Sequence, residues 1–261
     1  MKLSVKVNDV FGPGVDVEQM VQRSAAAGAE AIGFRPWYDD LAPLTTAIDD
    51  TGLDLAYLSG GSESTHGPEF PLTDPARRED AVAEIERAID VAAAADSDFL
   101  NVIPGRHEET LDPAVQHTTI VATLRDVAGH AEDAGVTLLL EPVNTRVDHP
   151  GIYLTSSYEG YEIVDAVQSP NVELLYDVYH QQITEGNLIA NVRQHVDEIG
   201  HVHVGDVPGR HEPGTGEINY PNVFDALAEA GYDGYVGCEF EPLVEPGTAI
   251  GDVRAMLDAA E

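Results

Sequence analysis

Four acidic or histidine residues in the second half of the chain follow or lie within apolar runs, where buried strands would end. Glu141 follows three leucines in VTLLLEP, and Asp177 follows two leucines and a tyrosine in VELLYDV. His203 lies in HVHVGDV and Glu239 in YVGCEFE. A charged group beside such runs is costly to desolvate unless it is paired, protonated or bound to a cation. One carboxylate alone would be read as a helix cap or an arginine partner, but four such residues on successive runs favour a shared ligand site.

Two glutamates, one aspartate and one histidine form an oxygen-rich donor set. Such a set suits Mg²⁺, Mn²⁺ or Co²⁺, whereas zinc more often has additional histidine or cysteine ligands. A divalent ion polarises a carbonyl group and stabilises the enediolate that forms when the neighbouring carbon loses a proton. Two glutamates on opposite sides of a bound α-hydroxy carbonyl compound could remove and return protons. The residue types therefore predict proton transfer next to a carbonyl group.

The elements that must position these residues recur as eight β-rich runs, each followed by a helical pattern. The runs cover residues 2–7, 29–34, 53–59, 98–104, 136–142, 172–178, 201–207 and 235–241. Several of the helical segments end at a glycine. These glycines are Gly28, Gly52, Gly135, Gly200 and Gly231. Eight βα units predict an α/β protein with a single-domain (β/α)8 TIM barrel over residues 1–261, in which the C-terminal ends of the strands carry the chemistry.

A doubly wound open sheet is the structural alternative. Such a sheet is expected to carry a glycine-rich phosphate loop after its first strand. The corresponding stretch here, VNDVFGPGVD, does not match GxGxxG. The near-continuous apolar run VTLLL also fits a parallel sheet that is covered on both faces. We therefore expect the barrel.

The net charge of −34, with Lys2 and Lys6 as the only lysines, restricts partners and compartment. The acidic residues are spread over every predicted helix, as in a solvated face rather than a patch that attracts a basic partner. A carboxylate-covered surface stays hydrated near 1 M ionic strength, where the Debye length is roughly 3 Å. We therefore expect a high-salt cytoplasm. No nucleic acid partner is expected, because the charge opposes contact with a phosphate backbone.

Cysteine content and hydropathy lead to the same compartment. Cys238 is the only cysteine, so no intrachain disulfide and no cysteine-based metal cluster is expected. No window approaches the roughly 20 apolar residues that span a bilayer, and the start of the chain has no signal-peptide core. These features predict a cytoplasmic protein without a membrane partner. A homo-oligomer is compatible with the sequence, but no motif fixes a subunit number.

Long runs in the second half of the chain are typical of one protein family. The runs are EPVNTR at 141–146, YDVYHQQITEGNL at 176–188, GHVHVGDVPGRHEPGTGEINYPNVF at 200–224 and GYDGYVGCEFEP at 231–242. They resemble the hydroxypyruvate isomerase family within the xylose isomerase-like TIM barrels. The resemblance is dense from about residue 136 to 242 and weaker in the first third of the chain.

The resemblance implies an aldose–ketose isomerase that converts hydroxypyruvate to tartronate semialdehyde with a divalent metal ion. By motif, Glu141 in EPVN and Glu239 in GCEF would be the proton donor and acceptor and also metal ligands. Asp177 in YDVYH would be the third ligand, and His203 would complete the set. The implied substrate is a small hydroxy-keto acid or a sugar.

His203 departs from the closest members of that family, in which we expect glutamine at this position. A histidine there resembles the ketose 3-epimerases of the same superfamily. Their Asp-x-x-His pair and metal histidine would correspond to Asp177, His180 and His203. A ketose 3-epimerase and a 2-oxo-tetronate-type sugar acid isomerase therefore stay open as alternatives to hydroxypyruvate isomerase.

Four further residues are candidate substrate contacts. Arg210 in PGRHEP could hold a substrate carboxylate through two hydrogen bonds, or equally tie down a neighbouring acid. His180 could orient the terminal oxygens of the substrate, or be a rim histidine with its own partners. Glu217 in TGEINY could bond to Arg210, although a cap on the next helix is the commoner role. Arg106, after the fourth run, is the fourth candidate.

Two other classes of function are weaker. Endonuclease IV-type DNA-repair enzymes use the same barrel, and His66 and His107 lie where their extra metal ligands could come. The net charge and the segment GDVPGRHEP, which lacks the Asp-x-His pair of those enzymes, argue against this class. A non-catalytic sugar-binding barrel is disfavoured because Glu141 and Glu239 are both present. The loop that contains His66 is a candidate determinant of substrate size.

Overall fold

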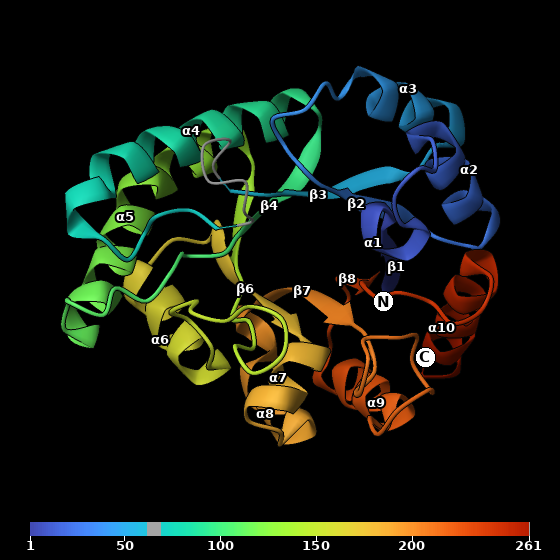
Figure 1. Cartoon of the computed structure of the whole chain (residues 1–261). Helices are drawn as coiled ribbons and strands as arrows, with labels where there is room; N and C mark the ends of the chain where they lie inside the picture. Colours follow the sequence, from blue (N-terminus) through green and yellow to red (C-terminus); the bar gives the residue numbers. More distant parts are fainter. Residues whose placement is uncertain (62–68, 261) are drawn as a thin grey trace.

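Eight parallel strands close into a barrel in sequence order in the computed structural model, which describes residues 1–61 and 69–260 (Figure 1). The strands are β1 (Lys2–Lys6), β2 (Ala31–Phe34), β3 (Asp54–Ser59), β4 (Ser97–Val102), β5 (Thr137–Leu140), β6 (Val172–Asp177), β7 (Ile199–Val204) and β8 (Tyr235–Cys238). Each strand pairs with its successor, and β8 pairs with β1. The predicted TIM barrel is confirmed.

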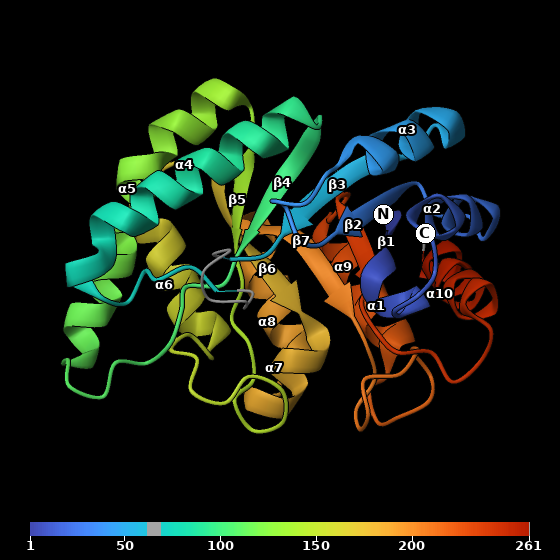
Figure 2. The same cartoon turned by 45° about the horizontal axis from the view of Figure 1, so that its top comes forward.

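Helices surround the barrel and connect its strands, as Figure 2 shows from a second direction. They are α1 (Val7–Phe11), α2 (Val17–Ala26), α3 (Ala42–Thr51), α4 (Arg78–Ala94), α5 (Pro113–Ala134), α6 (Ser157–Val167), α7 (Val178–Thr184), α8 (Leu188–His195), α9 (Tyr220–Ala230) and α10 (Pro246–Ala260). Two 3₁₀ turns, η1 (Pro75–Arg77) and η2 (Val196–Glu198), precede α4 and β7. Among the residues described, no helix has the length and apolar character needed to cross a bilayer.

Element boundaries differ from the sequence prediction mainly at the strand ends. The fifth strand ends at Leu140 and the eighth at Cys238, before the acidic residues that the predicted runs included. The prediction that Gly200 ends a helix was wrong, because Gly200 lies inside β7. A Cβ at position 200 would lie 2.2 Å from Glu173 Oε2 and 2.8 Å from Leu139 Cδ2, so the close packing of neighbouring strands accounts for this glycine.

The barrel interior is layered, and one aromatic layer lies two or three residues before the C-terminal ends of four strands. This layer consists of Tyr57, Phe99, His201 and Tyr235. The His201 ring centroid lies 5.1 Å from that of Tyr57, 6.1 Å from that of Phe99 and 6.0 Å from that of Tyr235. Alternate strand residues such as Leu138 and Leu174 are fully buried in the main apolar cluster outside this layer. The aromatic layer therefore forms a packed floor under the strand ends.

Gly237 on β8 allows one interior histidine to lie flat against its neighbour strand. Gly237 pairs with His203 on β7 in the parallel register. A Cβ at position 237 would lie 2.8 Å from His203 Cδ2 and 3.0 Å from Ser4 Oγ. Real Cβ atoms essentially never approach a side chain as closely as the first of these distances, so His203 could not keep its place beside a larger residue.

We therefore expect Gly237→Ala to lower the free energy of unfolding by about 1–3 kcal/mol, the usual cost of overpacking a core. Gly129→Ala is the control, because Gly129 lies exposed in α5 with nothing within 4 Å of an added Cβ. This change should instead stabilise the protein by about 0.5–1 kcal/mol, as alanine does within a helix. Urea unfolding of both variants measures the difference. Equal stability of the two variants would contradict the packing role of Gly237.

Candidate functional site

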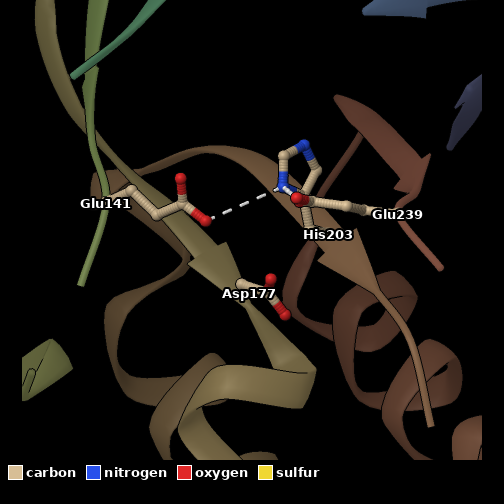
Figure 3. A group of neighbouring side chains, drawn as sticks. All are labelled: Glu141, Asp177, His203 and Glu239. Atoms are coloured by element: carbon tan, nitrogen blue, oxygen red, sulfur yellow. Dashed lines mark ion pairs between the residues drawn. The ribbon is translucent and has the colours of Figure 1, made fainter. Parts of the chain in front are cut away.

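The structure brings four of the predicted residues together at one end of the barrel. Glu141, Asp177, His203 and Glu239 are all buried, and each offers a ligand atom within 4.8 Å of those of the others (Figure 3). Figure 3 shows the four side chains converging from separate strand ends. Among residues 1–61 and 69–260, this is the one group of histidine, cysteine and acidic residues found with metal-ligand spacing.

Strand register explains how these side chains meet. Asp177, the last residue of β6, pairs with His203 on β7. Glu239 directly follows β8, and its backbone N–H donates to Val204 O at 3.0 Å. Glu141 directly follows β5 in the same way, at the C-terminal end of the barrel where loops carry the chemistry of this fold. Parallel closure therefore converts four distant sequence positions into one cluster.

Glu239 lies among three basic groups. Its Oε1 is 3.0 Å from Arg210 Nη2 and also accepts a hydrogen bond from Lys6 Nζ. Its Oε2 lies 2.5 Å from His203 Nδ1. Burial alone would raise the pKa of Glu239, but the positive charges of Arg210 and Lys6, together with His203, hold it well below the usual value. Glu239 is therefore ionised at neutral pH.

Glu141 has the opposite environment. Burial, reinforced by the nearby charge of Glu239, raises its pKa to about 7, with His203 opposing the shift. Asn101 Nδ2 donates a hydrogen bond to Glu141 Oε2 at 2.7 Å and holds the carboxyl group in place. Burial also raises the pKa of Asp177, against the attraction of Arg210. Two carboxyl groups whose pKa values are pushed apart are typical of an acid and base pair.

The donor atoms fit a metal ion. His203 Nδ1 and Glu239 Oε2 face each other, yet they are not aligned as a hydrogen bond, and no hydrogen-bond partner is found for either among the described residues. His203 Nδ1 is also 3.9 Å from Glu141 Oε1. An ion between these atoms would satisfy them and offset the repulsion of three buried carboxylates. The mainly oxygen set favours a hard divalent cation.

A cavity of about 370 Å³ lies over the cluster. Its lining combines the two glutamates with polar side chains from several strands and loops: Lys6, Asp9, Arg35, Asn101, Asp148, His149, Tyr179, His180 and Arg210. The volume is within the range of small-molecule sites, and convergent polar groups of this kind fix the orientation of a bound substrate. The cavity is therefore the candidate substrate site.

His180 and Arg210, two of the predicted substrate contacts, both line this cavity. The Nδ1 atom of His180 accepts a hydrogen bond from Asn144 Nδ2 at 2.7 Å, which leaves the ring proton on Nε2. Burial, with the charge of Arg210, holds the pKa of His180 well below its usual value, so the ring is neutral. A neutral histidine with an N–H at the cavity can donate to a substrate oxygen.

Arg210 is presented by an ordered loop. The buried carboxylate of Asp206 accepts backbone hydrogen bonds from Gly214 and Gly216 at 2.9 Å each and from Ile218 at 3.1 Å. Arg210 itself has a φ of 54°, a left-handed conformation that few non-glycine residues adopt. The loop therefore imposes this conformation on Arg210 at an energetic cost, which is common at functional sites.

The guanidinium group of Arg210 is committed to acidic partners. Its Nη2 lies 3.0 Å from both Asp177 Oδ2 and Glu239 Oε1. The group also stacks on the Tyr179 ring, 4.9 Å from its centroid. Arg210 therefore ties down two of the candidate ligands while it lines the cavity.

Arg106 and Glu217 are not brought to the cavity. The side chain of Arg106 is 63% exposed and lies 3.2 Å from Glu69 Oε1. Glu217 is exposed and accepts a hydrogen bond from Gln182 Nε2 at 3.1 Å. The cap on α9 is instead the side chain of Asn219. Both residues follow strand ends in the sequence, but the loops that carry them direct their side chains away from the cavity.

Of the two extra histidines, the one that the structure describes lies apart from the cluster. His107 is exposed, and its ring stacks on Tyr153 with centroids 6.1 Å apart. His66 lies outside the described residues. His107 does not belong to the group of candidate metal ligands found among the described residues.

Lys6, Asn101 and His149 line the cavity and were missed by sequence reasoning. Lys6 ends the first strand and is one of only two lysines, which is a signal that could have been used. Asn101 lies on β4, and its position two residues after Phe99 places it on the interior face. His149 lies in the loop after β5, where no hydrophobic periodicity indicates which way a side chain points.

Comparison with known proteins identifies a matching family and several relatives of the chain. The model of the xylose isomerase-like TIM barrel family matches residues 21–260. The 2-oxo-tetronate isomerase of Cupriavidus necator is 34% identical over 244 residues, covering 91% of this chain and 93% of that protein. Hydroxypyruvate isomerase of Escherichia coli is 31% identical, covering 93% and 94%. A solved structure named as an AP endonuclease, family 2, from Brucella melitensis has a TM-score of 0.87 at 27% identity and covers 98% and 99%.

The raised pKa of Glu141 predicts a pH dependence of stability in metal-free protein. An unfolded chain releases this proton near pH 4.5, whereas the folded protein keeps it to about pH 7, so this group destabilises the fold progressively as pH rises between those values. Glu141→Gln removes the ionisation and keeps an acceptor for Asn101. We expect the variant to be more stable than the parent at pH 8, on the order of 2 kcal/mol, and nearly equal at pH 4.5.

Urea unfolding of chelator-treated protein at the two pH values measures this difference. Glu162→Gln, at an exposed position of α6, is the control and should show no such pH-dependent gain. A stability difference for Glu141→Gln that is the same at both pH values would contradict the assigned shift.

Proposed function

Because the chain belongs to the xylose isomerase-like TIM barrel family, we propose that it is a metal-assisted aldose–ketose isomerase of a small hydroxy-keto acid. The observation that carries the proposal is the pair of buried glutamates, Glu141 and Glu239, which share one cavity and have opposite pKa shifts. The relatives named for hydroxypyruvate and for 2-oxo-tetronate indicate which substrates to test. Hydroxypyruvate is our first choice, and four-carbon 2-oxo acids are the next.

In this proposal the two glutamates move the carbon-bound protons. Glu239, kept ionised by Arg210 and Lys6, removes a proton from the hydroxymethyl carbon of hydroxypyruvate. Glu141 returns a proton to the adjacent carbon, while the hydroxyl proton passes from the first oxygen to the former carbonyl oxygen. The product is tartronate semialdehyde, and the proton held by Glu239 returns to Glu141 through solvent exchange.

Glu141, Asp177, His203 and Glu239 would hold the divalent ion, which we propose to be Mg²⁺ or Mn²⁺, with Co²⁺ as the alternative. A bound ion of this kind stabilises the negative charge that develops on the substrate oxygens. His180, which is neutral, would donate its Nε2 proton to a substrate oxygen, and Arg210 would hold Asp177 and Glu239 in place. Arg106 and Glu217 have no role in this proposal.

A ketose 3-epimerase is the second candidate, because His180 Nε2 lies 3.5 Å from Asp177 Oδ2 and a histidine occupies position 203. The same glutamate pair could exchange protons at one carbon of a ketose. A nuclease has less support, although the Brucella structure is named for one. One candidate ligand group is found in the part of the chain that is described, and the net charge of −34 opposes DNA.

The substrate prediction is tested with purified protein in molar KCl with Mn²⁺ or Mg²⁺. Hydroxypyruvate should yield tartronate semialdehyde, and Glu239→Gln should lower kcat by about 10²–10⁴-fold, as loss of a general base does. The control Glu245→Gln carries the same change on the surface, where the side chain is 58% exposed, and should keep full activity. Turnover of free ketohexoses without turnover of hydroxypyruvate or 2-oxo-tetronate would replace the isomerase by the epimerase.

The metal prediction is tested by binding rather than by activity. Calorimetry should give one Mn²⁺ per chain after removal of metals by a chelator. Asn101→Ala should weaken Mn²⁺ binding by about 10–100-fold, because Asn101 orients the ligand Glu141 through its 2.7 Å hydrogen bond. Asn222→Ala, at an exposed position of α9, is the matched control. Three ions per chain would favour the nuclease, and unchanged affinity in Asn101→Ala would remove the supporting role.

A further inference from the structure

Three side chains that the proposed proton transfer does not use directly form a wall on the β1 and β2 side of the cavity. Lys6 ends β1, Asp9 lies in α1, and Arg35 directly follows β2. All three line the cavity, and we call them the cationic wall. Pairing of β1 with β2, in which Lys6 lies opposite Gly33, places them side by side.

Asp9 bridges the two cations of the wall. Its Oδ1 lies 2.8 Å from Arg35 Nη2, and its Oδ2 lies 3.1 Å from Lys6 Nζ. The backbone N–H of Arg35 donates to Asn8 Oδ1 at 2.9 Å, which fixes the start of the arginine. The wall is therefore an ordered arrangement with two positive charges and one negative charge.

Lys6 is a buried cation that faces two carboxylates, Asp9 and Glu239. It is one of two lysines in a chain of net charge −34, and its side chain is only 7% exposed. Burying an ammonium group is costly, so its place at the cavity indicates that this site uses a positive charge. Lys6 also contacts Glu239, whose charge is shared with Arg210. When Glu239 binds a metal ion, Asp9 is the carboxylate that remains to pair with Lys6.

Arg35 is better placed than Arg210 to bind an incoming anion. The Nη2 atom of Arg210 lies between Asp177 and Glu239, so its charge is offset by two candidate metal ligands. Arg35 is 41% exposed, and the one acidic partner found for it among the described residues is Asp9. A guanidinium group presents five N–H donors in a plane that matches a carboxylate, and Arg35 lines the cavity.

We propose that Arg35 and Lys6 bind the carboxylate of the substrate and so select acids over neutral sugars. The inference deepens the proposed isomerase function. The effect expected on turnover rests on that function, whereas the effect expected on carboxylate binding does not. Because Lys6 contacts Glu239, a carboxylate held at the wall lies next to the carbon atoms that the glutamates serve. This arrangement favours a 2-oxo acid, in which the carboxylate is bonded to the carbonyl carbon, over an acid whose carboxylate lies at the end of a longer chain.

Two matched pairs of compounds test the inference. Glycerate and glycerol differ only in the carboxylate and are compared by calorimetric binding, with and without Mn²⁺. Hydroxypyruvate and dihydroxyacetone differ in the same way and are compared by kcat/KM. Arg35→Gln should weaken glycerate binding and raise KM for hydroxypyruvate by about 10–100-fold, the worth of hydrogen bonds to a charged group, and should lower the acid-to-neutral ratio accordingly.

Two further variants separate recognition from general charge effects. Arg193→Gln removes the same charge from an exposed ion pair with Glu229 on the outer helices and should leave glycerate binding unchanged. Asp9→Asn removes the competing carboxylate of the wall and should tighten glycerate binding. Weaker glycerate binding in Asp9→Asn would contradict the charge argument.

Failure of the inference and failure of the proposed function give different results. Equal glycerate binding by Arg35→Gln and the parent protein would overturn the inference, as would equal losses on the acidic and neutral members of each pair. Arg35-dependent glycerate binding in a protein that turns over no 2-oxo acid with Mn²⁺ or Mg²⁺ would support the wall and defeat the isomerase.

Discussion

Repulsion among three buried carboxylates is the constraint on which this end of the barrel depends. Glu141, Asp177 and Glu239 lie within one cluster, where the low dielectric makes each uncompensated charge costly. Lys6 and Arg210 offset part of that charge, and the nitrogens of His203, without a hydrogen-bond partner in the described chain, leave room for a cation to offset the rest. The asymmetric pKa values of the two glutamates follow directly, because the basic groups gather at Glu239 and leave Glu141 with a neutral amide partner.

The four candidate ligands could be predicted from sequence because their convergence depends on one regular feature. In a parallel barrel every strand delivers its C-terminal residues to the same end, so polar residues after apolar runs must converge. The basic residues that offset the charge of this cluster, Lys6 and Arg210, could not be predicted in this way. Lys6 reaches Glu239 only because β8 closes against β1, which joins the two ends of the sequence. Arg210 reaches Asp177 through a left-handed turn that Asp206 holds from inside its loop.

The same distinction explains the predictions that the structure does not support. Arg106 and Glu217 follow strands as the candidate ligands do, but several loop residues separate each from its strand, and loop geometry decides where such side chains reach. The end of a helix at Gly200 was inferred from residue type alone. In the fold, Glu173 and Leu139 pack so closely against β7 that only glycine fits at position 200. The sequence does not show which side chains of the adjacent strands will pack there.

The cationic wall and the glutamate pair also depend on each other physically. Arg210 and Lys6 lower the pKa of Glu239, which keeps it ionised but makes it a weak base. A substrate carboxylate at Lys6 and Arg35 would share their positive charge and bring its own negative charge close to Glu239. Both effects raise the pKa of Glu239, because a nearby negative charge favours the protonated form. An acidic substrate would therefore strengthen the base that attacks it, whereas a neutral sugar of the same size would leave that base weak.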